Sequence, residues 1–367
     1  MAIKFWTWLS VISLAGTAAI AIEPAISQIP NNNPAPVILP INAPVLYVAP
    51  GASGNGNASA PYGSITAALR SNPQPGTIIQ LAPGKYSAET GEVFPLKLAP
   101  GLTLRGDDSS KGKDVIIEGG GVFISPTFAR QNIALLASDE TVIAGITLTN
   151  VNPRGYALWL ESCRDVIVRN NRFIDTTHDG VFVTGDSAVT VSSNIFNKNR
   201  ANGISVVGSS KGEISDNLFE DTGFGLAIGQ QSTVNVINNR ILNNRTGVVI
   251  TNLSKPVLRG NLIKGSREDG VVVIKDRKGQ PAPDLGTIAD AGRNTFEANQ
   301  GKDINNSSGV PLVAVGNQLN RQKIAGDVDL NLPPEPPAKA VPQPAVKPAA
   351  KPATKPPVKP ASKPKTK

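Results

Sequence analysis

Residues 155–269 read GYALWLESCRDVIVRNNRFIDTTHD, GVFVTGDSAVTVSSNIFNKNRAN, GISVVGSSKGEISDNLFEDTGF, GLAIGQQSTVNVINNRILNNRT and GVVITNLSKPVLRGNLIKGSRED when the chain is cut before each recurring glycine. These five units repeat with a period of 22 to 25 residues. A fixed period of this size is typical of a solenoid, in which each unit buries its apolar face against its neighbours. The sequence therefore predicts a stack of coils.

Apolar and polar residues alternate within each unit, which indicates strands and not helices. From Gly180 onward, inward-facing apolar residues are expected one and three positions after each glycine: Val181 and Val183, Ile204 and Val206, Leu226 and Ile228, Val248 and Ile250. A second strand ends at an asparagine in each unit: Asn171, Asn194, Asn217, Asn239 and Asn261. Two strands and a polar turn per coil predict a parallel β-helix with coils about 4.8 Å apart.

The asparagine column and the opening glycines are interpreted as structural. Stacked amides at a tight turn satisfy backbone groups and one another, and asparagine tolerates a left-handed backbone. A leucine-rich repeat is the competing solenoid, because Val166 to Phe173 fits its strand segment. That fold needs a helix or an irregular arc on its far side, where these units carry a β-branched strand, so the β-helix is favoured.

The ends of the chain differ from the repeat. Residues 1–27 have the pattern of a secretory signal, with Lys4 before an apolar run and small residues near the end, although an uncleaved anchor is an alternative. Residues 28–44 form a Pro/Asn-rich linker, residues 45–330 the β-helix, and residues 331–367 a Pro/Lys-rich tail that we expect to be disordered. The protein is therefore expected to be secreted, periplasmic or at the cell surface, with no membrane span after signal cleavage.

The net charge of +8 is concentrated in the tail. Residues 332–367 hold eight lysines and one glutamate, a charge of +7, which leaves +1 for the rest of the chain. A nearly neutral body argues against a nucleic-acid partner. The tail is either a soluble spacer or a tether to an anionic envelope polymer or membrane surface.

Residues 46–87 carry Y-V-A-P-G (Tyr47 to Gly51), A-P-Y-G-S-I-T-A-A-L (Ala60 to Leu69) and P-G-T-I-I-Q-L-A-P-G-K-Y (Pro75 to Tyr86). With these motifs the chain resembles secreted right-handed parallel β-helix proteins of the pectin-lyase-like superfamily, and within it a family catalogued as a domain of unknown function. The resemblance implies an all-β, single right-handed β-helix. It leaves activity open, because the superfamily includes lyases, hydrolases, epimerases and proteins without known catalysis.

A short helix is expected to cover the open end of the first coil. Ser64 can cap it, and Ile65, Ala68 and Leu69 would form its apolar stripe. At the other end, a loop after Ile274 interrupts the repeat. Asn294 and Asn317 then restore the period.

The turn before each glycine collects most of the ionisable groups. The only histidine, His178, stands there beside Asp179, with Arg200 one coil above and Arg245 three coils above. A lyase or epimerase acting on a uronate needs a base and a cation that neutralises the carboxylate. We therefore take His178 or Asp179 as the candidate base and Arg200 as the candidate cation, with Arg245 as a further substrate-binding candidate.

Two other features of this edge bear on function. Asp175 and Asp221 lie two coils apart, about 9.6 Å by strand spacing, near the separation of an inverting hydrolase, but Lys198 between them suggests an exposed ion ladder. Trp159 and Phe182 are candidate sugar-stacking platforms, with Phe182 pointing out of the coil, whereas Tyr156 occupies an inward offset.

No cofactor is expected, and no metal site stands out, although a few surface carboxylates are compatible with Ca²⁺. The hypothesis with most support is an exported β-helix protein that binds or acts on extracellular or envelope polysaccharide. Whether it is an enzyme is left open. The alternatives are a lyase, epimerase or hydrolase at the His178 edge, and a non-catalytic structural surface protein.

Overall fold

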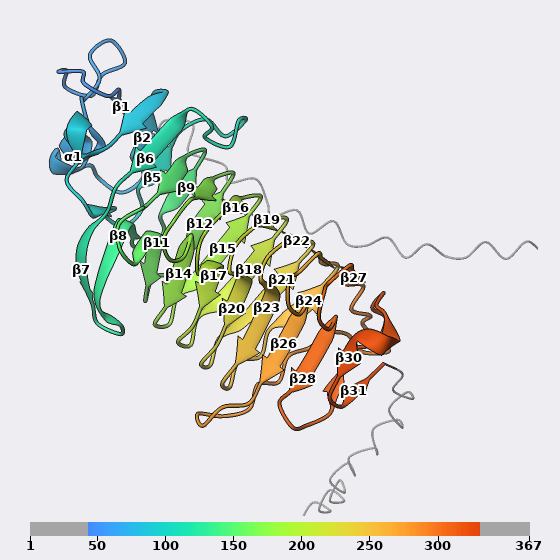
Figure 1. Cartoon of the computed structure of the whole chain (residues 1–367). Helices are drawn as coiled ribbons and strands as arrows, with labels where there is room; N and C mark the ends of the chain where they lie inside the picture. The colour runs from blue at the N-terminus through green and yellow to red at the C-terminus, as the bar shows by residue number, and fades with distance from the viewer. Residues whose placement is uncertain (1–42, 331–367) are drawn as a thin grey trace, which may run out of the picture. The chain divides into compact units, whose positions relative to one another are not determined.

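The structure, a computed structural model, describes residues 43–330. Its strands run from Val45 to Asp329 and form a right-handed parallel β-helix, as expected (Figure 1). The signal segment, nearly all of the linker and the Pro/Lys-rich tail lie outside the described residues. Within residues 43–330, no helix has the length and apolar character needed to cross a membrane.

Three parallel sheets, here named A, B and C, line the coil. Sheet A contains β1 (Val45–Val48), β2 (Ile78–Leu81), β5 (Thr103–Arg105), β9 (Val142–Ala144), β12 (Val166–Arg169), β15 (Ala188–Ser192), β18 (Lys211–Ser215), β21 (Thr233–Ile237) and β24 (Val257–Arg259). Sheet B contains β3 (Gly84–Tyr86), β6 (Val115–Glu118), β10 (Thr147–Thr149), β13 (Arg172–Ile174), β16 (Ile195–Asn197), β19 (Leu218–Glu220), β22 (Arg240–Leu242), β25 (Leu262–Lys264) and β27 (Thr295–Glu297).

Sheet C carries the edge of interest. It contains β4 (Leu96–Lys97), β8 (Ala129–Ala137), β11 (Gly155–Glu161), β14 (Val181–Thr184), β17 (Asn202–Val206), β20 (Phe224–Ile228), β23 (Thr246–Thr251), β26 (Val271–Ile274), β28 (Ile304–Ser307) and β30 (Ile324–Ala325). β7 (Gly121–Ser125) pairs antiparallel with β8, and β29 (Leu312–Val313) pairs with β31 (Val328–Asp329).

Each coil has three strands where the sequence predicted two. The strand that was expected to end at the asparagine is followed, after a short turn, by a strand of sheet B only three residues long, such as β13 or β16. The turn residue before each ladder asparagine has a left-handed backbone, with φ 53° at Asn170 and 55° at Asp216. The sequence predicted this backbone conformation at the ladder asparagine itself. In the structure it is adopted by the residue that precedes the asparagine.

The asparagine column is structural, as interpreted. The Asn194 Oδ1 accepts from the backbone N of Asn171 at 2.9 Å and from its Nδ2 at 3.1 Å, and the Asn194 Nδ2 donates to Val168 O at 2.9 Å. The same pattern continues through Asn217, Asn239, Asn261, Asn294 and Asn317. Each buried amide thus satisfies backbone groups that the turn would otherwise leave unpaired.

The opening glycines are required by packing against the apolar core. The rings of Phe173 and Phe196 stack at 5.0 Å between centroids, and those of Phe196 and Phe219 at 4.7 Å. A Cβ added to Gly203 would lie 2.5 Å from the Phe219 Cδ1 and 2.7 Å from the Gly225 carbonyl oxygen. Any side chain larger than hydrogen would therefore push the coils apart.

The expected capping helix is present as α1 (Ile65–Arg70). Ser64 Oγ accepts from the backbone N of Ala67 at 3.1 Å, and Ile65 and Ala68 are buried in the core. The Glu92 carboxylate accepts from the backbone N of Ile65 and of Thr66, at 2.7 and 2.8 Å. This acceptor satisfies free N–H groups at the start of the helix, where negative charge is favourable.

Candidate functional site

The first unit of the repeat is shifted by two residues from its expected register. Leu158, and not Tyr156, pairs with Val181, so Ala157 occupies the position expected for Gly155. The interpretation of Tyr156 as an inward-facing core residue was wrong. Its ring belongs to a second apolar cluster with Ile133, Trp159 and Phe182, separate from the core of the coil.

A hairpin covers this second cluster. β7 and β8 bring Phe123 and Phe128 over the outer face of sheet C, where Phe128 meets the ring of Phe182 edge to face at 4.9 Å. Trp159 stacks on Phe182 at 4.3 Å, and its Nε1 donates to the Glu161 Oε2 at 3.0 Å. The Glu161 Oε1 in turn accepts from Ser125 and Thr127 of the hairpin.

This cover corrects the prediction of an exposed stacking platform. Phe182 points away from the coil as expected, but it is only 7 % exposed and Trp159 is fully buried. A sugar ring cannot stack on either residue while the hairpin lies over them. The sequence did not reveal the cover because residues 121–137 lie outside the repeat.

His178 and Asp179 form a hydrogen-bonded pair at the start of β14. The His178 Nδ1 lies 2.9 Å from the Asp179 Oδ1, and since a carboxylate accepts, this nitrogen carries the hydrogen. The same oxygen accepts from the Asn202 Nδ2 at 2.9 Å. Asp179 is fully buried, and its Oδ2 has no hydrogen-bond partner among residues 43–330. The aspartate therefore orients the imidazole and leaves the His178 Nε2 as the nitrogen available to accept a proton.

Tyr156 lies against the other side of the imidazole. The Tyr156 hydroxyl is 3.4 Å from the His178 Nε2, and the ring centroids are 4.4 Å apart. Burial and the charge of Asp179 raise the pKa of Tyr156 to about 12, against the opposing effect of the nearby Arg154 guanidinium. Tyr156 is therefore protonated at neutral pH and able to donate. The candidate site consists of Tyr156, His178, Asp179 and Arg154, with Asn202 supporting Asp179.

Two residues of this site, Arg154 and Tyr156, were not predicted to be functional, and they flank Gly155 in the chain. Arg154 stands outside the aligned units, which begin at Gly155. Arg200, the expected cation, is exposed, and among residues 43–330 its side chain makes no hydrogen bond or ion pair with His178 or Asp179. The first unit is two residues longer than the second. An alignment that allowed for these two residues would have placed both Arg154 and Tyr156 beside His178.

The remaining candidates lie along the same edge without joining the cluster. The Arg245 guanidinium sits 4.5 Å above the ring centroid of the half-buried Phe224. The Asp221 Oδ1 pairs with the Arg267 Nη1 at 3.1 Å, both exposed. Within the described chain, Lys198 forms no ion pair with Asp175 or Asp221, so the expected ion ladder is wrong.

Asp269 occupies the position of Asp179 four coils further along and shows what an ordinary aspartate does in this turn. Its Oδ1 accepts from the backbone N of Lys302 at 2.6 Å, and its Oδ2 accepts from the Asn305 Nδ2 at 2.8 Å. Both oxygens of Asp269 have partners, whereas in Asp179 only the Oδ1 has partners among the described residues. The unpartnered oxygen and the histidine set Asp179 apart from the structural role.

The described part of the chain holds no group of three or more His, Cys, Asp or Glu side chains arranged to bind a metal ion. Two hollows in this part of the chain lie away from His178. One of about 580 Å³ lies on the outer face of sheet A beside Lys211 and Glu213, and another of about 450 Å³ lies at the turn that follows sheet C. The His178 cluster is therefore an edge site and not the floor of either hollow.

Comparison with known proteins supports the fold. Pectate lyase Pel9A superposes with a TM-score of 0.51 at 13 % identity, over 78 % of this chain and 77 % of its own. An alginate lyase from Paenibacillus sp. str. FPU-7 superposes with a TM-score of 0.50 at 18 % identity, over 73 % of this chain and 95 % of its own. At such identities the similarity shows the β-helix alone.

No curated protein matches the chain significantly. One family model does match, over residues 49–324, and its description is "Protein of unknown function (DUF1565)". The match spans the capping helix and nearly all coils of the solenoid. The chain belongs to this family, DUF1565.

Proposed function

We propose that the protein acts on an acidic polysaccharide at the edge of sheet C, by removing the proton beside a uronate carboxylate. The observation that carries the proposal is the pair formed by the buried Asp179 and His178, with the Tyr156 hydroxyl 3.4 Å from the free imidazole nitrogen. A base, its orienting carboxylate and a proton donor are thus assembled on one edge. The similarity of fold to lyases of acidic polysaccharides is compatible with this substrate class.

The chemistry assigns one step to each residue. The His178 Nε2 takes the proton from the carbon beside the carboxylate, and the positive charge of Arg154 stabilises the electron pair that moves into that carboxylate. Tyr156 then protonates the glycosidic oxygen that leaves, which is elimination by a lyase. If water instead protonates the opposite face of the same carbon, the product is an epimer, because Tyr156 lies on the same face as the His178 Nε2. In both cases one proton moves to His178, and the other comes from Tyr156 in elimination or from water in epimerisation.

Cations along the edge would hold the rest of the polymer. Arg154, Arg200 and Arg245 are all exposed on the turns before sheet C, and successive coils are about 4.8 Å apart. Their charges suit a chain of anionic sugars that runs parallel to the solenoid axis. Phe224 beneath Arg245 would present the apolar surface in this row.

The decisive experiment follows the ¹H NMR signal of the hydrogen beside the carboxylate in polymers of uronic acid dissolved in D₂O. This signal is lost in both reactions, because epimerisation replaces the hydrogen by deuterium and elimination leaves a carbon–carbon double bond in its place. His178→Gln, Asp179→Asn and Tyr156→Phe should each slow the loss of this signal by on the order of a hundredfold or more. Arg240→Gln, an exposed arginine on sheet B, is the control and should leave the rate unchanged.

If the signal of this hydrogen persists in every uronan tested, with a folded wild-type protein, the enzymatic proposal is rejected. Comparing Arg154→Gln with Arg200→Gln identifies the cation. We expect the larger loss at Arg154, because this is the arginine that reaches Tyr156.

The ends of the chain extend the proposal to location. We propose that residues 1–27 direct export and that the Lys/Pro tail tethers the protein to an anionic envelope surface, because the tail carries +7 of the total charge of +8. Envelope retention of the full chain and of a chain lacking residues 331–367 should be compared over a salt series. Retention that is equal for the two chains and independent of salt would refute the tether.

A further inference from the structure

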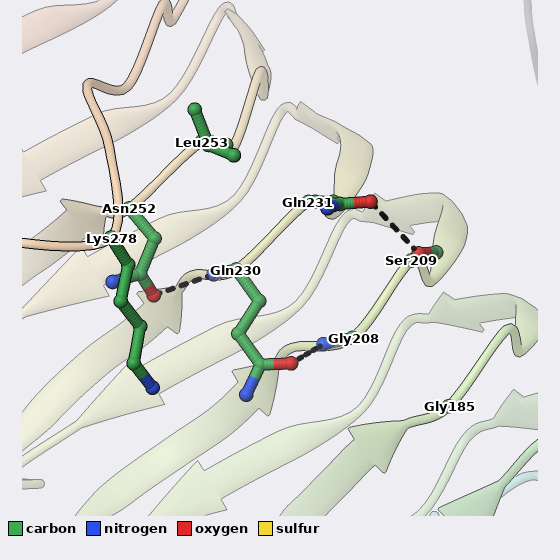
Figure 2. A pocket seen from close by; sticks show the side chains of 8 residues that line it. All are labelled: Gly185, Gly208, Ser209, Gln230, Gln231, Asn252, Leu253 and Lys278. Carbon is green, nitrogen blue, oxygen red and sulfur yellow. Dashed lines mark hydrogen bonds between the residues drawn. The ribbon is translucent and has the colours of Figure 1, made fainter.

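A second edge of the solenoid, opposite the His178 edge, carries an amide ladder of its own. The strands β14, β17, β20 and β23 of sheet C are each followed by a turn residue with a left-handed backbone, and the φ angles are 74° at Gly185, 74° at Gly208, 54° at Gln230 and 59° at Asn252. The Gln230 Oε1 accepts from the backbone N of Gly208 at 2.8 Å (Figure 2). The Asn252 Oδ1 accepts from the backbone N of Gln230 at 2.7 Å.

The ladder fixes which way the Gln230 amide faces. Because its oxygen is used by the backbone N–H of Gly208, its NH₂ group must face the other way. Within residues 43–330, the Gln230 Nε2 has no hydrogen-bond partner, and neither does the Lys278 ammonium. Figure 2 shows both nitrogens on the same side of the ladder. The surface between them offers donors and one positive charge.

The loop that interrupts the repeat brings Lys278 to this position. The Asp276 Oδ1 accepts from the backbone N of Lys278 at 2.8 Å, and its Oδ2 accepts from the Asn252 Nδ2. Gly279 packs so closely on Leu253 that an added Cβ would lie 2.3 Å from the Leu253 Cδ2. The loop is thus attached to the ladder on both sides of Lys278.

The cavity that results has a volume of about 450 Å³, within the range of small-ligand sites. Its lining includes Ser209, Gln230, Gln231 and Lys278. We infer that it is a binding site for an acidic saccharide, with the carboxylate or sulfate of one sugar unit between Lys278 and the Gln230 NH₂ group. A charged acceptor satisfies both donors at once, and hydroxyl groups of the sugar suit the amides that surround them.

This site is distinct from the Tyr156–His178 cluster, since the two lie at opposite ends of the β14 strand. It does not depend on catalysis there. An acidic polymer held at this edge would be anchored by the solenoid without meeting His178. The inference therefore stands or falls separately from the proposed function.

Isothermal titration with oligouronates, a sulfated oligosaccharide, a neutral oligosaccharide of the same length and inorganic sulfate tests the site. Gln230→Glu keeps an oxygen for the Gly208 N–H but replaces the donor by a negative charge, so it should abolish binding. Lys278→Gln should weaken binding by about tenfold or more. Arg277→Gln, an exposed charge on the same loop that does not line the cavity, should change it less than about twofold.

Preference for the uronate identifies a carboxylate ligand, and preference for the sulfated sugar identifies a sulfate ligand. Equal binding of the neutral oligosaccharide, or a response to inorganic sulfate with no gain from the sugar, would overturn the assignment. Unchanged binding in both Gln230→Glu and Lys278→Gln would do the same. His178→Gln should leave this binding intact, which separates the result from the fate of the enzymatic proposal.

Discussion

The Asp179 Oδ1 accepts from the His178 Nδ1 at 2.9 Å, while the Asp179 Oδ2 is buried without a partner in the described part of the chain. An unpaired buried carboxylate oxygen carries a desolvation cost, which a merely structural aspartate such as Asp269 avoids. The arrangement ties the imidazole to one tautomer and one orientation. Catalytic histidines are held in this way by a buried carboxylate.

The tautomer can be observed directly because His178 is the only histidine in the chain. We expect ¹⁵N NMR of the untagged protein to show hydrogen on Nδ1 and a free Nε2. Asp179→Asn should yield a mixture of tautomers, because an amide can donate as well as accept. Asp269→Asn is the matched control, and a spectrum altered as much by it as by Asp179→Asn would contradict the assignment.

Removing one ladder amide should destabilise the solenoid strongly. Asn217→Ala removes the acceptor for the backbone N of Asn194 and the donor to the Val191 carbonyl, and leaves both buried groups unpaired. We expect a loss of about 2–5 kcal/mol in the free energy of unfolding. Urea unfolding measures it, with Asn235→Ala on the exposed outer face of sheet A as the control expected within about 0.5 kcal/mol.

The glycine column gives a second stability prediction. Gly203→Ala places a methyl group against Phe219 and the Gly225 carbonyl, so we expect a loss of about 1–3 kcal/mol. In Gly229→Ala the added Cβ would lie 2.9 Å from the Thr251 Oγ1 and 3.1 Å from the Asn252 Oδ1. These atoms are at the ends of side chains and can move aside, so we expect a smaller loss. Equal melting temperatures for the two variants would argue against the packing explanation.

Alkaline pH should weaken the fold through Tyr156. The pKa of its hydroxyl is about 12 in the folded chain and about 10 when unfolded, so between these values only the unfolded chain releases the proton. The contribution of the Tyr156 hydroxyl to the free energy of unfolding is therefore fully present below about pH 10, and it is lost as the pH rises through about 12. Tyr156→Phe should flatten part of that decline in melting temperature, whereas Tyr47→Phe, at an exposed ring, should not.

The hairpin is held over the aromatic cluster chiefly by Glu161. Its carboxylate accepts from Ser125, Thr127 and Trp159, so Glu161→Ala should loosen the hairpin and expose the indole. In a chain without residues 1–27, Trp159 is the only tryptophan, and acrylamide quenching of its fluorescence reports the change. Glu118→Ala, which removes an exposed pair with Lys85, should leave quenching unchanged.

The sequence predicted those features that recur in every unit. Period-2 alternation, the glycine column and the asparagine column all reflect contacts between neighbouring coils, so five copies of each make the signal plain. The strands of sheet B escaped notice because three residues, as in Arg172–Ile174, are too few to show an alternation.

The site was only partly predictable because it depends on departures from the repeat. The sequence offered His178 or Asp179 as the candidate base, and the structure places the two side chains in contact. Tyr156 and Arg154 reach them only through the two-residue excess of the first unit. Likewise, the loop after Ile274 was recognised as an interruption, but the contact of Asp276 with Asn252 that places Lys278 is a tertiary one.

The asparagine ladder also determines how whole coils can be added to the solenoid or removed from it. Each amide belongs to one coil by covalent connection and completes the backbone of the coil before it, as Asn194 does for Asn171 and Asn217 for Asn194. Duplicating or excising one whole unit restores every such bond at the new junction, whereas removing half a unit breaks the chain of amides. Duplication of a unit can therefore lengthen the solenoid by a single coil, and excision of a unit can shorten it by one. The irregular turns that carry chemistry stay untouched in both cases.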